Sequence, residues 1–343
     1  MPAGAAALRA WLTWPAYGVL AATLLFSHFF PSLTARWQFF PFLLGMVFLG
    51  LPHGALDHLA PLFIKHKPLT ARYLVVFVLG YGALAAAYLA AWQVWPVGAL
   101  IVFLFMSWLH WGQGDAYYLE KFFGQSVPLT LPARLLVWAV RGGLPIILPP
   151  LTHPHVFTQV TGGILGWYGG PAGWVLGEWV RASGMAAFGL LVAAYGVRAW
   201  RTERQGFRRD MGEVAGLTVF FWLTPPILAV GVYFCVWHSA RHLARLALLD
   251  PADAAPLAGR CLGRVAWRTA VQALPMTLGA LALLGGLYLW HGRANVGVGG
   301  LVYLYLSLIA ALTFPHFALV LWMDREESRQ NLAHPVLVGR RGD

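Results

Sequence analysis

The chain carries little charge. Only 11% of its 343 residues are Asp, Glu, Lys or Arg, whereas 59% are hydrophobic. A soluble globular domain has roughly 25% charged residues. The mean hydropathy of this chain, +0.64, also lies far from that of a soluble domain. The scarcity of charge therefore excludes an ordinary soluble domain and predicts an integral membrane protein.

Cysteine is also scarce. Cys235 and Cys261 are the two cysteines of the chain. Two are too few for a disulfide scaffold, and their spacing excludes a CxxC zinc or redox motif. Internal repeats and long polar linkers are lacking, which favours one integral domain over residues 1–343. The first apolar run has no clear small-residue cleavage site, so we expect it to be retained as a span.

The few charges that are present are mostly basic, and the formal net charge is +11. In a soluble protein this excess would suggest a nucleic-acid surface. Here the basic residues gather between apolar runs, as at 65–72 and 198–209, where Lys and Arg mark the cytoplasmic side of a membrane. We therefore expect a multi-pass protein of the cell (inner or plasma) membrane, with the lipid bilayer and no nucleic acid as its partner.

Apolar runs long enough to cross about 30 Å of hydrocarbon predict an all-α, polytopic transmembrane helical bundle. They lie near 11–30, 38–60, 73–95, 98–119, 134–150, 183–200, 268–290 and 299–323. The run 213–248 is too long for one span, and the prolines at 225 and 226 interrupt it, because proline removes a backbone donor. We predict eight to ten crossings, with the glycine-rich region 151–182 as a loop at the outer interface.

Six of the twelve histidines lie inside or at the deep end of apolar runs: His53, His58, His110, His238, His242 and His316. With the N-terminus inside, the helices near 38–60, 98–119, 226–248 and 299–323 would all run in the same direction. At a rise of about 1.5 Å per residue, His53, His110, His238 and His316 then lie roughly 18–26 Å from the outer end of their helices. His242 follows His238 by four residues and shares its helix face.

A buried polar side chain in lipid is costly unless it is paired, so four imidazoles at one depth predict a shared metal. The predicted ligands are His53, His110, His238 and His242, and an all-nitrogen set suits Fe, Zn or Cu. A lone buried histidine such as His316 is more simply a hydrogen-bonded packing residue. Residues expected to support the ligands through hydrogen bonds are Asp57, His58, Gln113, Asp115, Arg241 and His316.

The residues alone leave several functions open. A membrane di-iron desaturase or hydroxylase also uses histidine clusters on helices, but it needs about eight ligands. A metal or proton transporter would place histidines at the midplane, although it would more often show repeats and paired acidic residues. A haem-binding membrane cytochrome is a third possibility.

Four motifs narrow this choice: GLPHGALDH, WLHWGQGD, YFCVWHSARH and FPHFALVLWMD, in this order. With these four motifs the chain resembles the Brp/Blh family of bacterial and archaeal membrane β-carotene 15,15'-dioxygenases. The resemblance extends from about residue 40 to 325. The resemblance implies cleavage of the central double bond of β-carotene by dioxygen, giving two all-trans-retinal. It also implies Fe(II) held by His53, His110, His238 and His242, and a rhodopsin as the recipient of the retinal.

A β-carotene substrate requires an apolar tunnel, because it is a hydrocarbon nearly as long as the bilayer is thick. Trp108, Trp111, Tyr233 and Trp237 flank the predicted ligands. Their rings are expected to line the tunnel and to stack against a conjugated polyene. The alternative is that they are ordinary packing residues of the bundle.

Overall fold

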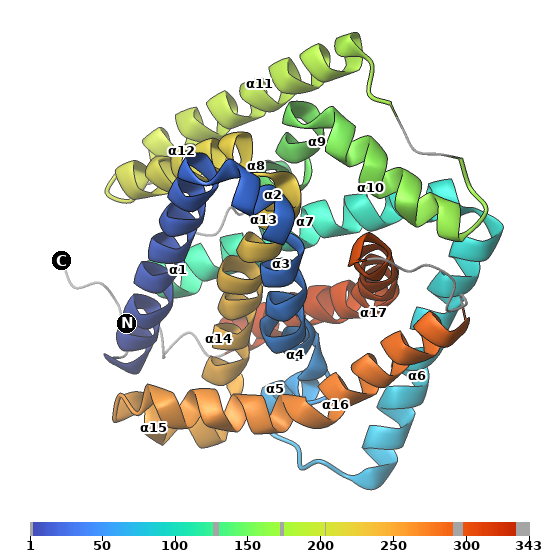
Figure 1. The fold of residues 1–343 in the computed structure, drawn as a ribbon. Coiled ribbons are helices and arrows are strands. Elements are labelled where there is room, and N and C mark those ends of the chain that lie inside the picture. The colour runs from blue at the N-terminus through green and yellow to red at the C-terminus, as the bar shows by residue number, and fades with distance from the viewer. Residues whose placement is uncertain (1–2, 126–129, 172–174, 203, 291–297, 334–343) are drawn as a thin grey trace.

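The computed structural model describes residues 3–125, 130–171, 175–202, 204–290 and 298–333. These residues form helices and connecting turns without any strand, which confirms the all-α prediction (Figure 1). The longer helices are α1 (Ala3–Phe29), α6 (Ala71–Val94), α7 (Pro96–Phe123), α8 (Leu131–Ile146), α10 (Pro154–Trp167), α11 (Glu178–Thr202), α12 (Phe207–Leu223), α16 (Leu262–Trp290) and α17 (Val298–Ala333). The shorter ones are α2 (Pro31–Trp37), α3 (Phe39–Gly45), η1 (Met46–Gly50), α4 (Leu51–Ala55), α5 (Ala60–Lys65), α9 (Leu148–Thr152), α13 (Pro226–Tyr233), η2 (Phe234–Ser239), α14 (Ala240–Leu249), η3 (Pro251–Asp253) and α15 (Ala254–Ala258).

Seven helical segments of the described chain are long and apolar enough to cross a membrane: α1, the α3–α5 segment, α6, α7, α11, α16 and α17. The predicted count of eight to ten crossings is therefore not confirmed. The run 134–150 divides between α8, which has only 16 residues, and the start of α9. In the run 213–248, His238, Arg241 and His242 lower the hydropathy of the α13–α14 segment, and α12 carries buried Asp210 and Glu213.

The helices separate into an interior group and a peripheral group. In their most apolar stretches, half of the residues of α7 and α17 are buried, whereas only 11% are buried in α6, α11 and α16. Large apolar side chains such as Leu79 on α6 and Leu278 on α16 are exposed. Such continuous apolar surface suits contact with lipid, and Figure 1 shows α11 and α16 at opposite edges of the bundle.

Local sequence explains where several helices begin and end. Pro96, Pro154 and Pro226 each occupy the first turn of their helix, where the missing N–H needs no partner. Gly124 ends α7 in the left-handed conformation, with φ of 68°, which a residue without a Cβ adopts at little cost.

Two wide π-helical turns interrupt the interior helices. η1 precedes α4, and η2 lies between α13 and α14, and the two turns contact each other. A Cβ added at Gly50 in η1 would lie 2.9 Å from the Phe234 ring in η2, so glycine permits this close approach. Such turns are frequent at functional sites, and here they stand beside predicted metal ligands.

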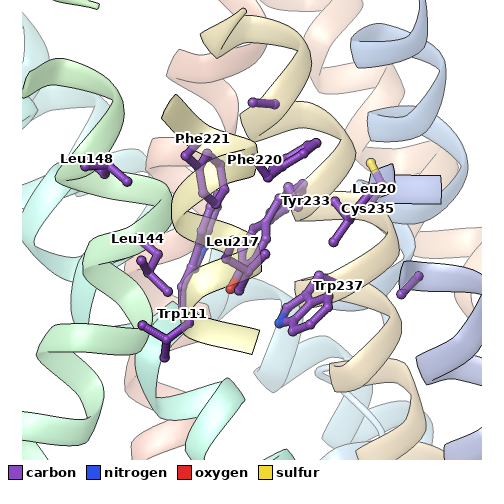
Figure 2. Packing of buried hydrophobic residues seen from close by; sticks show 14 of the residues in the cluster. Leu20, Trp111, Leu144, Leu148, Leu217, Phe220, Phe221, Tyr233, Cys235 and Trp237 are labelled. Carbon is purple, nitrogen blue, oxygen red and sulfur yellow. The ribbon is translucent and has the colours of Figure 1, made fainter. Parts of the chain in front are cut away.

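The largest apolar core packs α8, α12 and α13 against η2 and α7. Trp111, Tyr233 and Trp237 belong to it, together with Leu144 and Phe221, and Figure 2 shows these side chains close together. A core of large aromatic side chains fixes the interior helices in place. It lies beside the histidine-bearing segments and thereby positions them.

The region 151–182 was predicted as an interfacial loop, and its described part corrects this. Pro154–Trp167 forms the helix α10. The glycines favoured a loop in the prediction, but the apolar run that follows Pro154 is helical. Ile164 and Leu165 are buried. Trp174, one of the aromatic residues expected at the membrane interface, lies outside the described residues.

Candidate metal centre

Five histidines from five segments meet in the interior of the bundle. His53 comes from α4, His110 from α7, His238 from η2, His242 from α14 and His316 from α17, and all five are buried. We call these five residues the histidine cluster. The centroids of neighbouring rings are 4.7 Å apart for His110 and His316, 4.9 Å for His110 and His238, and 5.0 Å for His53 and His316 and for His242 and His316. The structure therefore brings together the four predicted ligands and adds His316.

The ring nitrogens of the cluster have few hydrogen-bond partners. Nδ1 of His110, Nε2 of His238 and Nε2 of His242 are buried without any. A buried polar atom left unpaired costs about 1–3 kcal/mol. The unpaired Nε2 atoms of His238 and His242 are explained if a cation binds their lone pairs, so the residues present fit a metal ion.

The spacing of the nitrogens also fits a metal. Nitrogen atoms of His53, His110 and His316 lie within 4.8 Å of one another, and the same limit holds for an overlapping group of Asp57, His242 and His316. His53 Nδ1 hydrogen-bonds the carbonyl of Gly50, which leaves its Nε2 free, as is usual for a metal-binding histidine.

Asp57 and His316 form a pair beside these nitrogens. Nδ1 of His316 lies 3.0 and 2.8 Å from the two carboxylate oxygens of Asp57. Tyr81, on α6, donates to Asp57 Oδ2 at 2.9 Å and lies 3.2 Å from the carbonyl of Leu312. Tyr81 is not among the residues predicted from the sequence, although its hydroxyl in the middle of an apolar span is a signal for such a role.

Asp115 and Arg241 belong to a buried network of charges next to the cluster. Arg241 pairs with Asp115, Trp237 Nε1 donates to Asp115 Oδ1 at 2.9 Å, and Arg141 Nη1 lies 3.1 Å from Asp115 Oδ2. Arg141 also pairs with Asp210, and with Glu213 at 2.8 Å. This network holds Arg241 in position between His238 and His242 on the same segment.

Gln113 and His58 take other positions near the cluster. Gln113 Nε2 donates to Asp324 Oδ2 at 2.6 Å, while its Oε1 is buried without a partner. His58 Nδ1 lies 3.0 Å from the carbonyl oxygen of Ala55, and its ring lies 6.5 Å from that of Phe77. Their supporting roles stay predictions.

A cavity of about 490 Å³ adjoins the cluster. His53, His110, His238 and His316 line it, and most of the rest of its wall is apolar. Of the four aromatic residues predicted to line a tunnel, Trp111 faces the cavity and stacks on the His238 ring at 5.2 Å.

The other three aromatic residues have different surroundings. Trp108 donates to the carbonyl of Ala139 on α8 at 2.8 Å. Tyr233 and Trp237 are almost fully buried in the apolar core. The Tyr233 ring stacks on the Trp111 ring, with 5.6 Å between their centroids. They back the wall of the cavity through Trp111.

Comparisons with known proteins agree on one family. The family described as "Beta-carotene 15,15'-dioxygenase" matches residues 44–324. The "Probable beta-carotene 15,15'-dioxygenase Blh" of Halobacterium salinarum is 40% identical over 299 residues, which are 86% of each chain. The "Probable beta-carotene 15,15'-dioxygenase Brp" of the same species is 28% identical over 83% of each chain.

A more distant relative is the "Beta-carotene 15,15'-dioxygenase" of an uncultured marine bacterium, 66A03. It is 24% identical over 82% of this chain and 93% of its own length. No solved structure matches the chain. The match over residues 44–324 includes all five cluster histidines. On these similarities, the chain belongs to the beta-carotene 15,15'-dioxygenase family.

Proposed function

We propose that this protein cleaves β-carotene at its central 15,15' double bond with dioxygen and releases two molecules of all-trans-retinal. The observation that carries the proposal is the placement of four of the five buried cluster histidines in the wall of a large apolar cavity. Membership of the family and the names of the relatives point to the same reaction.

The metal proposed for the cluster is Fe(II), held by His53, His110, His238 and His242. Zinc also accepts nitrogen ligands, but it has no redox chemistry. When bound, iron would supply the activation of dioxygen. An all-imidazole donor set without a required carboxylate is compatible with iron, and the unpaired nitrogens of His238 and His242 are available to it.

The protein's own contribution is to bind the polyene with its middle beside the histidine cluster. Leu100 lies ten residues before His110 on α7, and Pro226 lies twelve residues before His238, and both line the cavity. At about 1.5 Å per residue, this part of the cavity extends roughly 15–18 Å from the cluster. That is half the length of a substrate nearly as long as the ~30 Å hydrocarbon core.

The cavity also reaches two helices of the periphery. Gly82 of α6 and Gly279 of α16 line it, and a Cβ added at either would meet no atom within 4 Å. The substrate would enter from the lipid that surrounds these helices. Because the wall is apolar, it excludes water from the reacting double bond.

The cellular setting follows from the same proposal. The protein would lie in the cell membrane as a multi-pass protein, with α8 and the α13–α14 segment as additional crossings that bring the seven spans to nine. Retinal is an apolar product that leaves into lipid, where a rhodopsin could bind it.

The direct test is expression in a bacterium that accumulates β-carotene, followed by chromatography of the extracted pigments against retinal standards. The wild type and a His28→Ala control, which removes an exposed histidine of α1, should produce retinal, and His238→Ala should leave β-carotene intact. Intact β-carotene in cells that contain folded, iron-loaded wild-type protein would refute the proposal.

A further inference from the structure

The two ring nitrogens of His316 have different surroundings, and these surroundings indicate which nitrogen carries the hydrogen. Nδ1 faces both oxygens of the Asp57 carboxylate, at 3.0 and 2.8 Å. An ionised carboxylate only accepts hydrogen bonds, so Nδ1 must carry a hydrogen. In a neutral imidazole the lone pair is then on Nε2.

That Nε2 points into the histidine cluster. It lies 3.1 Å from Nε2 of His110, and His316 belongs to both overlapping groups of possible metal ligands in the described residues. Its depth in the sequence matches that of the predicted ligands, but depth alone does not separate a ligand from an ordinary packing histidine. The centroid of its ring lies within 5.0 Å of those of His53, His110 and His242.

The hydrogen bonding of His110 bears on the same question. If His110 donated from Nε2 to His316, its Nδ1 would be a buried lone pair, and Nδ1 has no partner. If Nε2 of His110 instead binds a cation, Nδ1 carries a hydrogen. The unpaired Oε1 of Gln113 lies one turn further along α7, on the same helix face, and is suited to accept it.

Charge balance supports a cation at this point. Asp57 is 2% exposed, and its ionic partner in the described residues is His316. A buried carboxylate without a compensating positive charge is strongly unfavourable. A metal on Nε2 of His316 would provide that charge through the ring, in the carboxylate–histidine–metal arrangement common in metalloproteins.

We propose that His316 is a fifth nitrogen ligand of the metal, and that Asp57 and Tyr81 are positioning residues that fix its ring and its hydrogen. The inference builds on the proposed iron site. Three separate segments contribute, since Asp57 follows α4, Tyr81 lies on α6 and His316 on α17. The segment that bears His53 is thereby coupled to the one that bears His316.

The test measures metal binding without substrate. The wild type, His316→Ala, Asp57→Asn and Tyr81→Phe are purified in detergent, stripped of metal and titrated with Co(II), whose visible absorption reports the number of its ligands. Thr277→Ala is the control, because it removes a buried hydroxyl of α16 that bonds only within its own helix.

Loss of a ligand should change the Co(II) spectrum of His316→Ala, and added imidazole should restore it by entering the space beside the cavity. Asp57→Asn should lower Co(II) affinity about 10–100-fold, as expected for an orienting partner, and Tyr81→Phe should lower it less. A wild-type spectrum and affinity in folded His316→Ala would overturn the inference. If His316→Ala does not fold, wild-type affinity in Asp57→Asn would overturn it as well. Failure of the wild type to cleave β-carotene would refute the proposed function without affecting this result.

Discussion

At the scale of single residues, the interior of this protein separates two kinds of buried polar group. Arg141, Asp115 and Arg241 compensate one another through ion pairs. His238 and His242 each keep an unpaired nitrogen. Because these three charged residues are paired and these two imidazole nitrogens are not, His238 and His242 can bind a partner from outside the chain.

Removing one charge from the buried network should destabilise the fold. Asp115→Asn would leave Arg241 with only the more distant Glu213, at 3.6 Å, and breaking a buried ion pair costs roughly 3–5 kcal/mol. We expect a lower melting midpoint in detergent and weaker iron retention, because Arg241 lies between His238 and His242.

The matched control is Glu120→Gln, which breaks an ion pair with Lys121 in which both side chains are about 30% exposed. Such a pair contributes about 1 kcal/mol or less, so the midpoint should stay near that of the wild type. Equal midpoints for Asp115→Asn and Glu120→Gln would contradict the role given to the network.

Depth counting along the sequence was sufficient to predict that His53, His110 and His238 share a layer, because regular helices convert residue number into distance. The same method could not assign the partners of His316. Asp57 and Tyr81 belong to other segments, and their contacts depend on how three helices rotate about their axes. Rotation of this kind is determined by packing, which periodicity does not reveal.

At the scale of elements, α7 and α8 approach so closely that only glycine fits between them. A Cβ at Gly112 would overlap the backbone of Trp138, with its carbonyl carbon 2.6 Å away, and a Cβ at Gly142 would meet the carbonyl of Trp108. Glycine inside a helix otherwise costs about 0.5–1 kcal/mol relative to alanine. Its presence in both helices is explained by this contact.

Gly112→Ala should therefore separate α7 from α8. Forcing extra atoms into a packed interior costs about 1–3 kcal/mol, and the shift would also move His110, two residues away. Thermal unfolding in detergent should show a clear loss of stability. Gly80→Ala on α6, where an added Cβ meets nothing within 4 Å, should leave stability unchanged. A stable Gly112→Ala would contradict this packing.

The prediction of elements succeeded for long apolar runs and failed where packing overrides them. Residues 71–94 form an uninterrupted helix as expected. The run 38–60 instead divides into α3, η1 and α4, because the contact between η1 and η2 reshapes the backbone. A local pattern cannot reveal a distortion caused by a segment almost 190 residues away.

At the scale of the whole molecule, the bundle surrounds an apolar space with a lipid-facing exterior. The interior helices α7 and α17 provide histidines and cavity wall, while α6 and α16 contribute to the wall and present exposed apolar side chains to their surroundings. On the proposed function, a hydrocarbon substrate would reach the cluster from the bilayer along this apolar wall.

Filling this space should reduce turnover without removing the metal. Gly279→Phe places a ring in the cavity, and we expect at least a tenfold lower kcat/KM for β-carotene with iron content equal to that of the wild type. Gly285→Phe is the matched control, since it lies on the same helix, has open space around its Cβ and does not line the cavity. Similar kinetics for the two variants would contradict the assignment of the cavity to the substrate.

The measurement that tests the central claim most directly is a metal exchange on the purified protein. Metal-free protein in detergent is loaded with Fe(II) or with Zn(II), supplied with β-carotene and dioxygen, and analysed for retinal. Both metals suit the nitrogen ligands, but only iron can activate dioxygen. The account predicts two retinal per β-carotene from the iron form and none from the zinc form. Retinal from the zinc or metal-free form, or none from the folded iron form, would contradict it.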